Sequence, residues 1–175
     1  MQSVEVVLDD DTDARIRAQW NRLAAAGLPS QAGHTGASNR PHITLALTEA
    51  ITDGTASRLA EAVAALPLPV TVGGLLVFGA RRFVLARLAV PSAELLALQG
   101  RVTAALDGGL DPHGTFAAGR WTPHVTLARR LSADQVGSAL AVLGDVPAID
   151  GRLVRARRWD VAVKRESWVE SWTAR

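Results

Sequence analysis

Two short stretches, PHITLAL at residues 41–47 and PHVTLAR at residues 123–129, decide how this chain folds. Each has the alternation of a β-strand, in which successive side chains point to opposite faces of the sheet. His42 and Thr44 therefore share one face of their strand, and His124 and Thr126 share one face of theirs. The residues between them are apolar, which predicts that the other face is buried. Each stretch presents an imidazole and a hydroxyl side by side.

The segments around the two stretches follow the same order. Working outward, apolar periodicity predicts a strand, a helix, a strand, a helix and a strand in each half of the chain. Three pairs of equivalent residues are separated by nearly the same number of positions: 81 from Asp11 to Ser92, 82 from His42 to His124, and 80 from Pro67 to Pro147. We therefore predict one two-lobed domain over residues 1–175, with an internal repeat of approximately 3–78 and 82–164.

The expected elements can be placed from strand alternation, helix stripes and capping residues. Strands are expected at 3–8, 41–47, 68–78, 82–90, 123–129, 153–164 and 167–173. Helices are expected to begin near residues 10–12, 92 and 132, and another has Leu59, Val63 and Leu66 on its apolar face. Ser132 and Gln135 form a capping-box pattern. Short connections that contain glycine, such as 78–81, favour antiparallel pairing. The expected fold class is α+β, bilobal, with duplicated β-α-β-α-β units whose two antiparallel sheets face a central groove.

Two imidazoles facing each other suit the cleavage of a phosphodiester without a metal. One group must take a proton from the attacking oxygen while another protonates the leaving oxygen. Histidine, with an ordinary pKa of about 6.5, can do either near neutral pH. The hydroxyls of Thr44 and Thr126 can donate to the non-bridging phosphate oxygens. The predicted catalytic set is His42, Thr44, His124 and Thr126, and the symmetry of the pair leaves open which histidine is the acid.

Two other interpretations of the motif have to be weighed. A single His-x-Thr in a strand is usually a packing or surface feature, but two copies at equivalent positions of a repeat favour a shared site. A metal site is the functional rival. The sequence has no HExxH motif, no cysteine and no carboxylate beside either histidine, so we expect neither a metal nor a cofactor.

Composition limits the class of protein. Hydrophobic residues make up 48% of the chain and charged residues 21%, which is typical of soluble globular proteins. No apolar run is long enough for a membrane helix, and the N-terminus MQSVEVVLDD lacks the basic start of a secretory signal. The absence of cysteine suits a reducing compartment. We expect a cytoplasmic monomer. Lys164 is the one lysine among 19 basic residues, and we attribute this arginine excess to a GC-rich genome rather than to nucleic-acid binding.

PHITLAL and TPHVTLAR, placed 82 residues apart in so short a chain, resemble the paired motifs of the 2H phosphoesterase superfamily. Within that superfamily, the chain is most similar to the bacterial 2′-5′ RNA ligases, or RNA 2′,3′-cyclic phosphodiesterases, over essentially its whole length. The resemblance implies hydrolysis of a 2′,3′-cyclic phosphate to a 2′-phosphate, on RNA ends or on small cyclic nucleotides. The family picture would make His42 the acid and His124 the base.

The resemblance leaves other functions open. Some family members join RNA ends through a 2′,5′ linkage, which is the same chemistry run backwards with a hydroxyl in place of water. Another reaction of the superfamily, such as opening the cyclic phosphate of a nucleotide sugar, would use the same motifs. A protein that binds RNA ends with little turnover is the alternative from another class.

Four further residues are candidates for substrate binding. Arg40 precedes the first motif, and Arg130 follows the second, where strict alternation puts it on the face of His124 and turns Arg129 away. Phe78 and Arg82 flank a hairpin which, in similar family members, lies at the rim of the groove and could stack a base. The alternatives are a solvated strand end for the arginines and ordinary hairpin packing for Phe78.

The long connection at 28–40 has a length that is often functional, and it carries His34. His113 lies in the equivalent loop of the second half. We interpret both as exposed loop histidines without a catalytic role.

Overall fold

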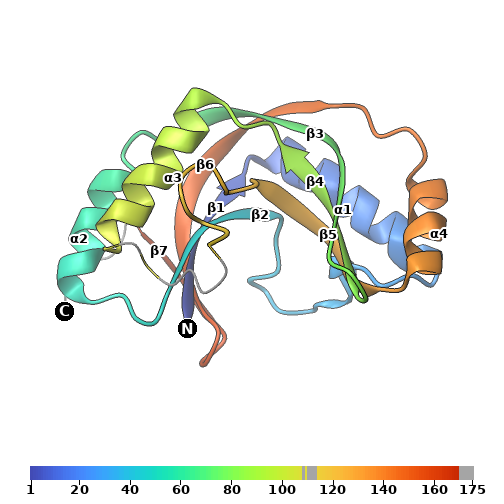
Figure 1. The fold of residues 1–175 in the computed structure, drawn as a ribbon, viewed down its shortest axis with the longest axis horizontal. Coiled ribbons are helices and arrows are strands. Elements are labelled where there is room, and N and C mark those ends of the chain that lie inside the picture. The colour runs from blue at the N-terminus through green and yellow to red at the C-terminus, as the bar shows by residue number, and fades with distance from the viewer. Residues whose placement is uncertain (108, 110–113, 170–175) are drawn as a thin grey trace.

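The computed structural model describes residues 1–107, 109 and 114–169, and in this part of the chain seven strands form one curved sheet backed by four helices (Figure 1). The strands are β1 (Gln2–Leu8), β2 (His42–Thr48), β3 (Leu68–Phe78), β4 (Phe83–Ala89), β5 (His124–Leu131), β6 (Ile149–Asp160) and β7 (Arg165–Trp168). The helices are α1 (Asp10–Ala25), α2 (Asp53–Ala62), α3 (Ala93–Ala105) and α4 (Ala133–Leu143), and a short 3-10 turn, η1 (Gln31–Gly33), lies between α1 and β2. No helix in the described residues is long and apolar enough to cross a membrane.

The strands lie in the order β2-β1-β6-β3-β4-β5, and β7 pairs with β6. All the pairs are antiparallel, so the α+β class and the antiparallel pairing predicted from the sequence are confirmed. The two sheets expected from the sequence are joined into one. β6 connects the two halves of the sheet, because it pairs with β3 through Ile149–Leu153 and with β1 through 153–160. The part of the last predicted strand beyond residue 169 lies outside the described residues.

Each helix begins where a side chain takes over the free N–H groups of its first turn. The capping residues are Asp9, Thr52, Ser92 and Ser132. Ser132 and Gln135 form the capping box that their spacing predicts. The first cap lies just before the predicted 10–12, because the carboxylate of Asp9 accepts from the N–H groups of both Thr12 and Arg152 and so ties α1 to β6.

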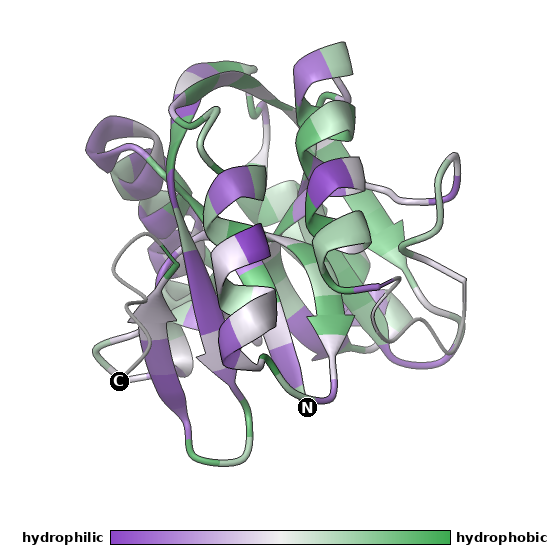
Figure 2. Ribbon diagram, turned by 90° about the vertical axis from the view of Figure 1, so that its left-hand side faces the viewer, coloured by the Kyte–Doolittle hydropathy of each residue, from purple (hydrophilic) through white to green (hydrophobic). Residues whose placement is uncertain are grey.

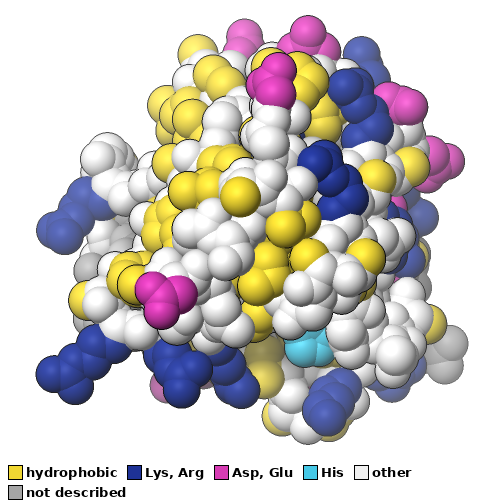
Figure 3. Space-filling model, turned by 90° about the vertical axis from the view of Figure 1, so that its right-hand side faces the viewer, with side chains coloured by type: hydrophobic (Ala, Val, Ile, Leu, Met, Phe, Trp, Pro, Cys, Tyr) yellow, Lys and Arg dark blue, Asp and Glu magenta, His cyan; other side chains and the backbone are white. Residues whose placement is uncertain are grey.

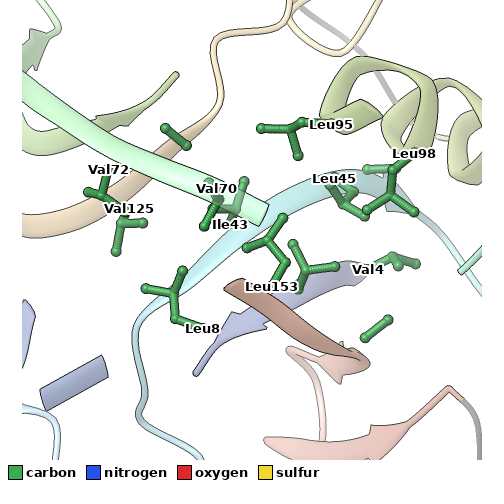
Figure 4. Packing of buried hydrophobic residues seen from close by; sticks show 14 of the residues in the cluster. Val4, Leu8, Ile43, Leu45, Val70, Val72, Leu95, Leu98, Val125 and Leu153 are labelled. Carbon is green, nitrogen blue, oxygen red and sulfur yellow. The ribbon is translucent and has the colours of Figure 1, made fainter. Parts of the chain in front are cut away.

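The helices pack against the sheet in two pairs, α1 with α4 and α2 with α3 (Figure 1). Each pair takes one helix from each half of the chain. α2 and α3, which lie in front in Figure 2, each carry both hydrophilic and hydrophobic residues. Beneath them, Ile43 and Leu45 from β2 and Val125 from β5 are fully buried in the apolar core (Figure 4). The core therefore holds the motif strands in place from the side opposite to their histidines.

The strand registers correspond between the halves. The facing pairs are Val7–His42 and Glu5–Thr44 in the first half, and Leu88–His124 and Ala86–Thr126 in the second. The partner strands are offset by 81 residues, from Glu5 to Ala86, one fewer than the 82 residues between the motif histidines. This correspondence supports the internal repeat that the sequence predicts.

Candidate active site

β2 and β5 present their motifs in the predicted alternation. His42 and Thr44 are half-buried, whereas Ile43 and Leu45 between and beyond them are fully buried. In β5, His124 is half-buried and Thr126 is almost covered, at 8% exposure. Each imidazole and its threonine therefore lie on the face of the sheet that is turned away from the core.

The curvature of the sheet brings its two edge strands together. β2 and β5 stand at opposite ends of the strand order, and yet they contact each other. The positive charge of His42 is one of the causes that lower the pKa of His124. The contact between β2 and β5 brings the two motif strands next to each other.

Two tryptophans brace the motif strands, each from the other half of the chain. The indole N–H of Trp20, on α1, donates to the backbone carbonyl of Thr126 at 3.0 Å. The indole N–H of Trp121, in the connection before β5, donates to the carbonyl of Thr44 at 3.2 Å. Sequence reasoning missed this role, because Trp20 on an amphipathic helix is expected to pack in the core and Trp121 lies in a connection with no regular pattern.

Both imidazoles are oriented in the same way. Nδ1 of His42 lies 2.8 Å from the carbonyl oxygen of Arg40, and Nδ1 of His124 lies 2.8 Å from that of Thr122. A carbonyl oxygen only accepts hydrogen bonds, so in each ring Nδ1 carries the proton and donates it. Nε2 is then the nitrogen that can exchange a proton with a bound molecule.

His124 lies in apolar surroundings. Its ring centroid is 4.8 Å from that of Phe78, and the two planes are tilted by 48°. Burial lowers the pKa of His124, and the positive charges of Arg129 and His42 lower it further, while the hydrogen bond to Thr122 acts in the opposite direction. His124 is therefore biased toward its neutral form, with a free lone pair on Nε2.

His42 has charged neighbours instead. Oε1 of Glu5 lies 3.7 Å from its Nε2, and Nη2 of Arg157 lies 3.4 Å from its Nδ1. The sequence shows no carboxylate near either motif, and that expectation is wrong for His42, because pairing of β1 with β2 brings Glu5 beside it. The one hint was a glutamate inside the otherwise apolar alternation of β1. Arg157 could not be singled out within the arginine-rich run RARR.

The structure places the four candidate binding residues at two locations. Arg40 lies near His42, with its guanidinium 5.4 Å from the ring centroid of Trp168 and 3.8 Å from Glu166. Phe78 contacts His124. Arg82 is exposed in the β3–β4 turn, and its Nη1 donates to the carbonyl of Arg130 at 3.4 Å, so these two arginines lie together near the end of β5.

The alternation argument for Arg130 does not hold. The register of β4 and β5 shifts twice, and Arg130 itself has a φ of 63°. These irregularities let both Arg129 and Arg130 reach solvent, where a regular strand would have put them on opposite faces. Arg129, which the alternation turned away from the site, is the residue whose charge acts on His124.

The remaining sequence predictions concern the loops and metals. His34 is exposed, as expected, and lies beside a surface cavity lined by Arg17, Trp20 and the 32–39 segment. His113 lies outside the described residues. Among the residues that the structure describes, no group of three or more histidine, aspartate or glutamate side chains could hold a metal ion.

The fold of this chain is similar to those of several solved structures. It is similar to a crystal structure described as a phosphoesterase and to Escherichia coli LigT complexed with 3′-AMP, each with a TM-score of 0.56 and 17% identity over 95% of this chain and 92% of the other. It is also similar to Kluyveromyces marxianus Usb1 with uridine monophosphate, with a TM-score of 0.50 and 13% identity over 96% of both chains. At such identities the similarity establishes the fold.

No curated protein sequence matches the chain. The family model of the 2′-5′ RNA ligase superfamily, by contrast, matches residues 12–164, which include both motifs and five of the seven strands, all but β1 and β7. The paired His-x-Thr strands, the fold and this match agree, and the chain belongs to the 2′-5′ RNA ligase superfamily of 2H phosphoesterases.

Proposed function

We propose that this protein is a metal-independent phosphodiesterase that hydrolyses 2′,3′-cyclic phosphates to 2′-phosphates. The observation that carries the proposal is the pair of half-buried imidazoles on contacting strands, each with Nδ1–H held by a backbone carbonyl and Nε2 left for proton transfer. Two such groups supply the acid and the base that displacement at phosphorus needs.

The surroundings of the histidines divide the two roles. His124, which burial biases toward the neutral form, accepts a proton on Nε2 from the attacking water. The water oxygen bonds to phosphorus, the bond from phosphorus to the 3′-oxygen breaks, and His42 gives its Nε2 proton to that oxygen. The products are a 2′-phosphate and a 3′-hydroxyl, and solvent returns the two histidines to their starting states. Thr44 and Thr126 donate to the non-bridging oxygens.

Residues around the histidines would hold the rest of the substrate. Phe78 offers an aromatic surface beside His124 on which a base can stack. Arg40 lies beside His42, and Arg82 and Arg130 lie together at the other end of the site, so guanidinium groups are available for phosphates on both sides. The similar structures of LigT and Usb1 contain nucleotides, 3′-AMP and uridine monophosphate, which supports a substrate of this class. RNA ends and small cyclic nucleotides are the proposed substrates.

The test is hydrolysis of nucleoside 2′,3′-cyclic phosphates and of short RNA with a cyclic end, measured in EDTA. We expect the wild-type chain to form only 2′-phosphates, and His42→Ala and His124→Ala to lose at least a hundredfold in rate. His34→Ala is the matched control, since it removes an exposed histidine outside the pair. Full activity in either motif variant, or loss of activity on chelation, would contradict the proposal.

The same assay separates the alternatives. Net formation of 2′,5′-linked RNA from ends with a free 5′-hydroxyl would identify a ligase, in which a hydroxyl replaces water. Binding of a 2′-phosphate product without any turnover would identify an RNA-end-binding protein. A cytoplasmic location and a monomeric state remain predictions, which fractionation and sedimentation would check.

A further inference from the structure

The acidic residues of the sheet are divided unevenly between its two ends. β3, β4 and β5 contain no aspartate or glutamate, and neither do the longer segments 62–93 and 112–133 around them. Every carboxylate on the strands lies instead on β1, β6 or β7. Arginines occur at both ends of the sheet, so those at the β3–β5 end are the ones without an acidic residue on the same strands.

The arginines beside His42 are paired with carboxylates. Nη2 of Arg157 lies 2.8 Å from Oε2 of Glu5, and its Nη1 lies 2.8 Å from Oε2 of Glu166. Nη2 of Arg40 lies 3.8 Å from Oε1 of Glu166. The charges of these two guanidinium groups and two carboxylates cancel. This end of the site therefore adds no net charge that would attract further phosphates.

The other end carries a basic surface, which we call the arginine turn. It consists of Arg81 and Arg82 in the β3–β4 turn and Arg129 and Arg130 at the end of β5, all of them exposed. Nη1 of Arg82 donates to the carbonyl of Arg130 at 3.4 Å, so the two segments adjoin. Among the ion pairs between described residues, none involves any of the four. Four positive charges are thus left to solvent.

This arrangement favours a ligand with several phosphates. An exposed guanidinium without a carboxylate partner attracts anions, and its planar fork can bind two phosphate oxygens at once. On the right-hand side of the molecule, where Figure 1 draws the β3–β4 turn, basic side chains project from the lower edge of the surface (Figure 3). The net charge of the chain is only +2, so the placement of these arginines, and not their number, carries the argument.

The arginine turn lies at a distance from the reacting histidines. Arg129 is five residues after His124 on β5, which is about 17 Å of extended strand. Phe78 lies between them in the chain path of the hairpin, because its ring contacts His124 and it precedes Arg81 by three residues. A ligand that reaches from His124 past Phe78 to the arginine turn is therefore a chain of several nucleotides rather than one.

We propose that the arginine turn binds the phosphate backbone of a single-stranded RNA whose end lies at the two histidines, so that the strand leaves the site along β3, β4 and β5. That the end reacts there rests on the proposed function, whereas binding of the strand by the turn does not. A small cyclic nucleotide gains nothing from the turn. The surface therefore favours RNA ends over small cyclic nucleotides as the substrate.

The direct test is the salt dependence of binding to a fluorescent single-stranded RNA octamer, measured by anisotropy. Each phosphate contact on a single strand contributes about −0.7 to the slope of log affinity against log salt. Between about 50 and about 200 mM KCl, four contacts predict an affinity loss of about fiftyfold and two contacts a loss of about sevenfold. Arg81→Gln/Arg82→Gln should show the smaller dependence. The wild-type dependence in this variant would overturn the proposal.

Two matched variants separate the charge of the turn from other effects. Arg81→Lys/Arg82→Lys keeps both charges and should keep the wild-type salt dependence. Arg15→Gln/Arg165→Gln removes two exposed arginines outside the turn and should also keep it. Circular dichroism checks that all variants are folded. A reduced salt dependence in either matched variant would contradict binding at the turn.

An acidic segment of another protein is the rival ligand for such a surface. A labelled polyglutamate of the same length tests it in the same assay. We expect it to bind much more weakly than RNA, because it lacks both the phosphate geometry that guanidinium groups match and the bases that stack on Phe78. Binding as tight as that of the octamer would overturn the proposal.

Turnover gives a reading that separates this inference from the proposed function. In Arg81→Gln/Arg82→Gln, kcat/KM for an octamer with a 2′,3′-cyclic end should fall about tenfold more than kcat/KM for a nucleoside 2′,3′-cyclic phosphate. Equal losses on the two substrates would count against the turn as a binding surface. If the wild-type chain hydrolyses neither substrate, the proposed function fails, and the binding assay still decides whether the turn holds RNA.

Discussion

The indole nitrogen of Trp20 lies 3.0 Å from the backbone carbonyl of Thr126, although the two residues are 106 positions apart. The bond joins a helix of the first half to the motif strand of the second. Trp121 makes the corresponding bond to Thr44 in the opposite direction. Each motif strand is therefore held partly by a tryptophan from the other half of the chain.

Trp20→Phe should therefore lower both stability and activity. Trp20 is 3% exposed, and the change leaves the carbonyl of Thr126 without its donor, at a cost of about 1–3 kcal/mol. Urea denaturation measures the loss, and kcat/KM should fall as well, because β5 carries His124. Trp121→Phe is the matched variant, and a smaller loss is expected there, since Trp121 is only half-buried. Equal stability of Trp20→Phe and the wild type would show that the bond contributes nothing.

The lowered pKa of His124 predicts the acid limb of the pH profile. A base works only when it is neutral, so kcat/KM should rise with pH through the pKa of His124, below the ordinary histidine value of about 6.5. Removing a neighbouring positive charge raises that pKa, and Arg129→Ala should move the limb to higher pH. Arg130→Ala is the control, and its limb should stay where it is. A limb above 6.5 in the wild type would contradict the assignment of His124 as the base.

Phe78→Leu tests the stacking surface. We expect KM for a nucleoside 2′,3′-cyclic phosphate to rise by about tenfold, within the 1–3 kcal/mol that stacking contributes per base. The KM for ribose 2′,3′-cyclic phosphate, which has no base, should rise much less. Phe83→Leu is the comparison, because Phe83 packs against the core near the same hairpin. An equal rise in KM for both substrates would mean that Phe78 acts only by packing against His124.

Arg87→Met addresses stability apart from the site. The side chain of Arg87 is fully buried and donates to the carbonyls of Val72, Gly73, Val146 and Pro147. Leaving these acceptors without a donor should cost about 2–4 kcal/mol in thermal or urea unfolding. Arg15→Ala should change it by less than about 0.5 kcal/mol, since Arg15 is exposed and its ion pair with Asp11 spans 4.0 Å. If Arg87→Met lowered the free energy of unfolding as little as Arg15→Ala does, the four carbonyls would have found other donors.

The sequence predicted the motif strands and their faces well, because strand alternation and an apolar core act over a few residues. His42 and Thr44 point away from the core for the same reason that Ile43 is buried in it. Helix caps such as Ser132 were predictable for the same reason, since the capping bond spans only three residues.

What the sequence could not predict depends on pairing between distant strands. Glu5 and Arg157 are 152 residues apart, and only the register of β1 with β6 brings them together. The irregularities in β5 could not be foreseen either, so Arg129 was assigned to the wrong face. The joining of the two expected sheets depends on the length of β6, which no local pattern in the chain reveals.

The pairing of β3 with β6 has a mechanical consequence. Residues 68–72 and 149–153 are hydrogen-bonded across the middle of the sheet, and each of these strands continues into the other pairings of its half. A hinge motion between the halves would have to break that ladder. On the proposed function, this ladder would keep the two imidazoles at one separation before substrate binds.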